Sequence, residues 1–196
     1  MRTRGFTLIE MAVVLAIIAV LAAVLTPIVT GYLDQARVVR ATGDVKTIAD
    51  ALRLFYKDTG YYPVYSSLAN ARTGTTIAHE LVGPGDTPAT TIGWAFASGT
   101  SASLITQLNQ NIFGLPTGSQ VTNPGKVAYR GPYIGALDSD PWGNAYVVTA
   151  DNLTNSGTNW AFVVSAGPNG QLDTSPNQAN TAAFALSGDD IVAVIK

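Results

Sequence analysis

The sequence predicts an α+β protein with one long N-terminal helix and a small antiparallel β-sheet. Three observations lead to this prediction. An uncharged apolar run over residues 11–33 is long enough to cross a bilayer as a helix. An amphipathic pattern at helical spacing then continues to Asp58. Near the C-terminus, three short segments rich in β-branched and aromatic residues alternate with loops rich in Asn, Gly and Asp.

The long helix is expected to run from Phe6 to Asp58, which is about 80 Å at 1.5 Å per residue. Because that exceeds any bilayer, its second half must pack against a soluble domain. Gly60 is the expected C-terminal stop. Pro27 removes a backbone donor and is expected to kink or locally melt the helix. The apolar face of the second half consists of Val38, Val45, Ile48, Ala49, Leu52, Phe55 and Tyr56.

The rest of the chain divides into a polar middle and a β-rich end. Residues 66–126 are rich in Gly, Thr, Ser, Asn and Pro, and we expect loops there with short helices near residues 76–82 and 101–113, the second capped by Ser101. Strands are expected at residues 146–149, 160–164 and 191–195. One apolar face of their sheet is expected to cover the amphipathic half of the long helix.

The N-terminus combines a basic leader with a carboxylate inside an apolar run. Arg2 and Arg4 precede Gly5, and Glu10 lies at the head of the apolar segment. An acid at the centre of a membrane helix costs about 2.5–3.5 kcal/mol, and less near its end. If the chain is cut after Gly5, the new amine of Phe6 can compensate Glu10 in the same or a neighbouring chain. The alternative, an ordinary secretory signal cleaved near residues 22–23, leaves the acid unexplained.

This N-terminus, continuing as Thr-Leu-Ile-Glu after Phe6, resembles the class III leader of type IV pilins and type II secretion pseudopilins. The resemblance implies cleavage by a prepilin peptidase after Gly5, N-methylation of Phe6, and assembly through Glu10. Pro27 stands where that family usually has its helix-kinking proline. A Tyr-Pro step at residues 62–63, just after the long helix, is also similar to pseudopilins.

A second motif is a turn signal near the β-rich end. An Asp-Pro step followed by Gly-Asn favours a tight turn, and the tryptophan between them is expected to pin that turn onto the core. The motif closely resembles a signature of the major pseudopilin of type II secretion systems, and its value is structural rather than catalytic. It consists of Asp140, Pro141, Trp142, Gly143 and Asn144.

A third motif gathers oxygen-bearing side chains in the C-terminal loops. Calcium prefers six to eight oxygen ligands in flexible geometry, and the resemblance implies a calcium-binding loop here. Asn169 stands where the family usually has an aspartate, and the loop that follows is longer than usual. The alternative is a set of Asx and Gly turns with solvated acids. The candidate calcium ligands are Asn169, Asp173, Asp189 and Asp190.

Composition excludes several classes of function. The full chain has 11 Lys and Arg against 13 Asp and Glu, and loss of Arg2 and Arg4 would leave 9 against 13, a formal charge of −4. No basic tract remains for nucleic-acid binding. The absence of cysteine excludes disulfides and thiolate metal sites, so something else must hold the C-terminal region. His79 is the one histidine, and no catalytic constellation or nucleotide-binding motif is present, so no enzyme is expected.

These observations define the expected organisation. We expect residues 1–5 to form a leader, 6–33 a transmembrane and assembly stem, and 34–196 a periplasmic or extracellular domain with an insertion at 66–126. The basic leader predicts a single-pass inner-membrane protein with its N-terminus in the cytoplasm.

The resemblance implies a structural subunit that polymerises through its N-terminal helix into a pilus or a pseudopilus for type II protein secretion. The alternative is a major or minor type IV pilin of a surface fibre used in adhesion, motility or DNA uptake. The implied partners are other copies of the chain, other pilins or pseudopilins, the prepilin peptidase and an inner-membrane assembly platform.

Overall fold

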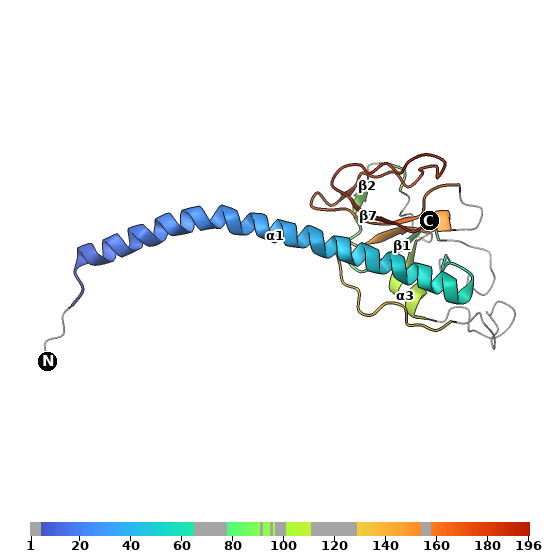
Figure 1. Ribbon diagram of the computed structural model, residues 1–196, viewed down its shortest axis with the longest axis horizontal. Helices are drawn as coiled ribbons and strands as arrows, with labels where there is room; N and C mark the ends of the chain where they lie inside the picture. The colour runs from blue at the N-terminus through green and yellow to red at the C-terminus, as the bar shows by residue number, and fades with distance from the viewer. Residues whose placement is uncertain are drawn as a thin grey trace. The chain divides into compact units, whose positions relative to one another are not determined.

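The computed structural model describes residues 5–64, 78–90, 92–94, 96, 101–110, 129–153 and 158–196. The chain divides into two compact units, Met1–Arg37 and Val38–Lys196. Helix α1, Leu8–Thr59, contributes to both units (Figure 1). The predicted combination of a long N-terminal helix with a small sheet is confirmed.

In the first unit, α1 is apolar and exposed on every side. Each residue from 8 to 37 has an exposed side chain. The most apolar 18-residue window of α1 has a mean hydropathy of 2.9, so by length and composition this helix qualifies to cross a membrane. The helix continues through Pro27, so the local melting expected at this proline is not observed. Thr26 and Thr30 donate their hydroxyls to the carbonyls of Ala22 and Pro27, at 2.7 and 3.0 Å.

In the second unit, α1 is amphipathic and half buried. It ends at Thr59, and Gly60 follows with φ of 75°, a left-handed conformation that glycine adopts without a Cβ clash. The Gly60 amide donates to the Tyr56 carbonyl at 2.7 Å, which closes the last turn. The buried residues of this part are Ala41, Val45, Ile48, Ala49, Ala51, Leu52, Phe55 and Thr59.

The main sheet has five strands in the order β3-β1-β4-β5-β7. These are β3 (Ser101–Ser103), β1 (Glu80–Val82), β4 (Val147–Thr149), β5 (Phe162–Ser165) and β7 (Ile191–Val194). All neighbouring pairs are antiparallel except β1 and β3, which are parallel. The sheet is therefore mixed, whereas the sequence predicted a purely antiparallel one.

Three smaller elements complete the described fold. Strands β2 (Ala89–Thr90) and β6 (Gln171–Leu172) form a separate parallel pair. Helix α3 (Leu104–Asn109) follows β3 directly, and the 3-10 helix η2 (Asp151–Leu153) follows β4 closely.

The three C-terminal strands lie where the sequence predicted them, but both short helices require correction. The helix expected near residues 76–82 is wrong, because Glu80–Val82 pairs with β4 as strand β1. The helix expected at 101–113 begins only at Leu104, because residues 101–103 pair with β1. Its N-cap is therefore Ser103, whose side chain accepts from the Thr106 amide, and not Ser101. Residues 76–77 and 111–113 lie outside the described residues.

Two hydrophobic clusters cover the two faces of the sheet. Leu81, Val148 and Val163 face the buried side of α1. This position was predicted for the strands that hold Val148 and Val163, but not for Leu81. Val147, Phe162 and Val164 point to the opposite face, where Trp94 and Leu172 cover them. Because side chains alternate along a strand, coverage on both faces leaves β4 and β5 completely buried.

Candidate functional site

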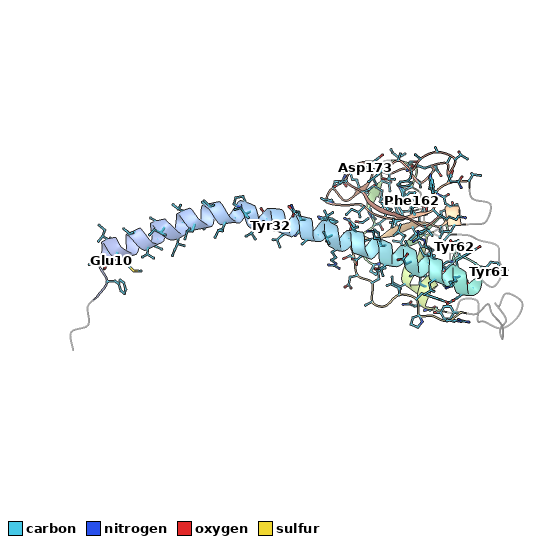
Figure 2. All side chains as sticks on the ribbon, viewed as in Figure 1. Glu10, Tyr32, Tyr61, Tyr62, Phe162 and Asp173 are labelled. Atoms are coloured by element: carbon cyan, nitrogen blue, oxygen red, sulfur yellow. The ribbon has the colours of Figure 1, made fainter. Side chains whose placement is uncertain are left out.

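Glu10 lies in the first turn of α1, near its N-terminal end (Figure 2). It contacts Thr7. Its carboxylate accepts hydrogen bonds from the backbone amide and the hydroxyl of Thr7, at 2.9 and 2.8 Å. In return, the Glu10 amide donates to the Thr7 hydroxyl at 3.3 Å. This reciprocal arrangement is a capping box, which satisfies helix N-terminal amides that have no partner within the helix.

Sequence reasoning missed this role of Thr7, although the spacing Thr-x-x-Glu before an apolar run is the capping-box signature. The helix therefore begins at Leu8 rather than at Phe6. The carboxylate remains exposed despite its local bonds. Glu10 thus has a structural role within its own chain and is accessible to a second group.

The surroundings of Glu10 are apolar. A groove of about 380 Å³ beside this residue is lined by Phe6, Ile9, Val13 and Val14. Phe6 and Ile9 expose 83% and 70% of their surface. An exposed carboxylate bordered by uncovered apolar side chains indicates a surface that another apolar element covers.

Asp140 organises the predicted turn at residues 140–144. One oxygen of its carboxylate accepts from the amides of Trp142 and Asn144 at 3.0 and 2.8 Å. The other accepts from the Ser165 hydroxyl, at 2.7 Å, and so fastens the turn to β5. Asp140 is 3% exposed, whereas Trp142 is only half buried and belongs to neither hydrophobic cluster. The turn is therefore held by a buried carboxylate rather than by the tryptophan.

The four candidate calcium ligands lie in one network. The side-chain amide of Asn169 donates to Asp173 at 2.9 Å, and its backbone amide donates to Asp189 at 3.0 Å. The Asp190 carboxylate accepts from the amides of Asp173 and Thr174, at 3.0 and 2.6 Å. Burial raises the pKa of Asp190, and the hydrogen bonds from Thr174 and Asp173 oppose that rise.

Two features of this acidic network bear on a cation. The Oδ1 atoms of Asp189 and Asp190 are buried without a hydrogen-bond partner among the described residues, although buried carboxylate oxygens normally have one. Gly188 brings the backbone against Asp173, and a Cβ there would overlap that carboxylate. However, within the described ranges no three acidic or histidine side chains converge as a metal site. Backbone carbonyls would have to complete any coordination sphere.

Hydrogen bonds hold the C-terminal loop in this cysteine-free chain. Gln178 donates its side-chain amide to the carbonyls of Ser175 and Ala185, at 3.1 and 2.9 Å, and accepts from the Ala185 amide at 2.8 Å. Asn152 donates to the carbonyls of Trp160 and Pro176, at 2.9 and 2.8 Å. These amides fasten the loop to itself and to the strands beneath it.

His79 pairs with Asp151 through its Nδ1 atom. His79 directly precedes β1, and Asp151 is the first residue of η2. The hydrogen bond that the Asp151 carboxylate accepts raises the pKa of His79, with smaller contributions from the charges of Asp151 and Glu80, while burial lowers it. Both side chains are about half exposed, so this pair is a surface contact.

Comparison with known proteins agrees with the predicted N-terminal leader and with the expected pilin-like fold. Residues 1–26 match the family model described as the prokaryotic N-terminal methylation motif. The type II secretion system core protein G of Escherichia coli is 28% identical over 184 residues, which cover 91% of both chains. The present chain is therefore similar to type IV pilin-like proteins.

Two further relatives show shorter similarity to this pilin-like chain. The type II secretion system core protein G of Pseudomonas aeruginosa is 49% identical over 59 residues, which cover 30% of this chain and 42% of that protein. The type IV major alpha-pilin of Moraxella bovis is 34% identical over 84 residues, covering 41% of this chain and 52% of that protein. No solved structure gives a significant match. None of these names is that of an enzyme.

The methylation motif, the exposed apolar helix and these relatives together identify the chain as a filament subunit of the pilin type. The motif and the apolar helix also fit a single-pass anchor in the inner membrane. The exposed surface of α1 around Glu10 is then the first candidate for assembly.

Proposed function

We propose that this pilin-like protein is a subunit of a type II secretion pseudopilus, a filament that supports protein export across the outer membrane. The observation that carries the proposal is the alignment with the Escherichia coli core protein G over nine-tenths of both chains. The turn centred on Asp140, which resembles the signature of that protein class, adds support. Deletion of the gene should stop the export of secreted enzymes and leave surface fibres unchanged. Unchanged export would contradict the proposal.

The proposal includes the processing and orientation of the chain. A prepilin peptidase cleaves after Gly5, and Phe6 becomes the methylated N-terminus. Arg2 and Arg4 hold the leader in the cytoplasm, and an inner-membrane platform moves the processed subunit into the filament. Mass spectrometry of the mature protein should give a chain that starts at Phe6 with one added methyl group. A chain starting near residues 22–24 would indicate an ordinary secretory signal instead.

Glu10 has two proposed roles, which two substitutions can separate. Its charge pairs with the Phe6 amine of a neighbouring subunit, and its capping box starts α1. Glu10→Gln retains a capping-box residue but removes the charge, whereas Glu10→Leu removes both. If the charge drives assembly, both variants insert into the membrane and neither forms filaments. Normal filaments from Glu10→Gln would show that only the capping box matters.

We also propose that the acidic loop binds calcium. The carboxylates of Asp189 and Asp190 would hold the ion together with backbone carbonyls, and the unpartnered Oδ1 atoms of both residues support this. The bound ion would offset the repulsion among Asp173, Asp189 and Asp190. A ligand that binds only the native state stabilises it by about 2.7 kcal/mol at a hundredfold excess over Kd.

Thermal unfolding of the protein in calcium and in chelator tests this site. The Tm should rise with millimolar calcium, and Asp189→Ala and Asp190→Ala should abolish the difference. Magnesium provides the ionic-strength control. Identical melting curves in calcium and chelator would show that the network is only a solvated turn.

A surface type IV pilin is the second candidate function. The similarity to the Moraxella bovis major alpha-pilin, 34% identical over 84 residues, supports it. The insertion expected at residues 66–126 would also suit a fibre that displays decoration outside the cell. Electron microscopy of cells at native expression separates the two functions. Long extracellular fibres that disappear on gene deletion would favour the surface pilin.

A further inference from the structure

A groove along the second half of α1 has no occupant within the described chain. It has a volume of about 370 Å³ and lies between α1 and the edge strand β7. Its walls are Lys46, Asp50 and Arg53 on the helix and Val192, Ala193 and Val194 on the strand, and Ala49 is its small floor residue. We refer to it as the α1–β7 groove.

One side of this groove is an open sheet edge. In the antiparallel β5–β7 pair, residues of β7 alternately direct their backbone groups toward β5 and away from it. The Val194 carbonyl points away, because it accepts from Arg53 at 2.7 Å, so Val192, two residues earlier, has the same outward orientation. The uncharged sequence Ile-Val-Ala-Val lacks the charges that usually protect an edge strand.

The two basic side chains at the rim of the groove differ in their partners. Arg53 donates to Asp50 at 2.8 Å and to the carbonyls of Val194 and Ile195, so it closes the C-terminal end of the edge. Lys46 is exposed and forms no ion pair with any residue that the structure describes. The N-terminal half of the groove is therefore open and carries an unpaired cation.

The same domain presents a segment with complementary features. Residues 135–138, Gly-Ala-Leu-Asp, form no helix or strand, and only Leu137 packs against the core. Gly135 has no atom within 4 Å of a Cβ built on it, so its surroundings are open. Asp138 is exposed and has no ion pair or hydrogen bond in the described part of the chain. Two small exposed residues and an unpaired acid, with Leu137 between them turned toward its own core, suit a groove that has a lysine at its rim.

We propose that residues 135–138 of a second copy dock in the α1–β7 groove, with Asp138 paired to Lys46 and the backbone against the outward edge at Val192. This inference rests on the proposed filament and identifies one of its subunit contacts. The contact would extend the proposed assembly surface of the stem along the same helix, because Lys46, Asp50 and Arg53 also lie on α1.

The two surfaces lie on different sides of the domain. Arg40 and Asp58 contact the chain next to this segment, through the Ser139 carbonyl at 3.4 Å and the Tyr133 hydroxyl at 3.2 Å. At 100° per residue, both lie about 120° around α1 from Lys46. Groove and segment therefore cannot pair within one copy. A contact between two different surfaces is heterologous, and it extends into an open helical array unless it closes into a ring.

Cysteine cross-linking in assembled filaments tests the contact directly, because the native chain has no cysteine. Cells that express Ala136→Cys with Ala193→Cys in one chain are treated with a short bismaleimide. The expected product is a ladder that extends beyond dimers. The matched control pairs Ala136→Cys with Ala183→Cys, an exposed position outside the groove, and should give no ladder. Filaments whose ladder is no stronger than that control would overturn the contact.

Charge exchange is the second test and leaves the groove walls intact. Lys46→Asp and Asp138→Lys should each lower filament yield about two- to fivefold, the size expected for an exposed ion pair. The double variant should restore the yield, and Lys57→Asp, an exposed lysine outside the groove, should have no effect. Wild-type yield from either single variant, or no restoration in the double, would overturn the contact. If the wild-type chain forms no filament at all, the proposed function fails and the contact fails with it.

Discussion

Helix α1 contains two segments whose apolar residues differ in burial: those of the first are exposed, and those of the second are buried. In the first unit, Leu15 and Ile17 expose 63% and 55% of their surface. In the second unit, Val45 and Ile48 are completely buried under the sheet. The local structure is the same, so the difference lies in what covers the helix. The domain supplies its own cover, while the stem requires lipid or other subunits.

This difference separates stability from assembly. Contacts within the domain determine its free energy of unfolding, whereas the exposed apolar surface of the stem contributes nothing to that quantity until another molecule covers it. Substitutions in the two segments should therefore affect different measurements. Each of the following predictions tests that separation.

Removal of the stem should have the largest effect. A truncated chain that begins at Asp34 keeps every buried residue of α1, so its domain should fold as a monomer. Assembly should be abolished, because the stem supplies the apolar surface that filament packing buries. Circular dichroism and analytical ultracentrifugation measure both outcomes. Filaments formed by the truncated chain would contradict the proposed division of roles.

A matched pair of isoleucine substitutions compares the two segments directly. Ile48→Ala leaves a cavity in the core and should lower the free energy of unfolding by about 2–5 kcal/mol. Ile17→Ala should change it by less than about 0.5 kcal/mol, because Ile17 is 55% exposed. Tryptophan fluorescence of the full chain in detergent is a suitable measurement, since Trp94, Trp142 and Trp160 all lie in the second unit. Equal losses for both variants would show that the segments are coupled.

Asp140→Ala should destabilise the domain by about 2–4 kcal/mol, because three donors lose a buried charged acceptor. The corresponding fall in Tm is about 4–16 °C for a domain of this size. Asp138→Ala, two residues away and exposed, is the control and should leave the Tm unchanged. Since the change lies in the second unit, the mature N-terminus should be processed normally. A Tm loss from Asp138→Ala equal to that from Asp140→Ala would refute the buried-acceptor explanation.

The His79–Asp151 pair should give the smallest effect. The folded pKa of His79 is raised, mainly by its hydrogen bond to Asp151. The pair therefore stabilises the domain fully below the unfolded pKa of about 6.5, and this contribution is lost as the pH rises through the folded pKa. Since both side chains are half exposed, it should not exceed about 1 kcal/mol.

Urea unfolding of wild type and His79→Ala at several pH values measures this contribution. The two proteins should differ at pH 5.5 and converge at alkaline pH. A difference that is constant across this range would assign the effect of His79 to packing rather than to charge.

The parts of the fold that sequence predicted are those with a local signal. Periodicity over fifty residues identified α1, and dense β-branched segments identified β4, β5 and β7. The short strands β1 and β3 were missed because three residues carry too little pattern. The state of β1 is decided by its pairing with β4 far along the chain, and that of β3 by its pairing with β1. The same pairing displaced the start of α3 to Leu104.

The candidate sites also divide into features with a local sequence signal and features that depend on the folded chain. The turn at Asp140 was predictable from its Asp-Pro and Gly-Asn steps, but the bond from Ser165, 25 residues later, depends on the folded sheet. The capping box of Thr7 and Glu10 was readable from spacing alone and was overlooked. The network around Asp173, Asp189 and Asp190 was expected as a cluster, while the two unpartnered oxygens became visible only in three dimensions.

The amide bonds of Gln178 and Asn152 have a consequence for how a subunit matures. Their loop is closed without any covalent cross-link, so no oxidant, disulfide isomerase or pairing choice stands between translocation and the native state. The domain should reach the same structure at the same rate in a strong reductant as in air. Folding of this subunit therefore sets no requirement for oxygen.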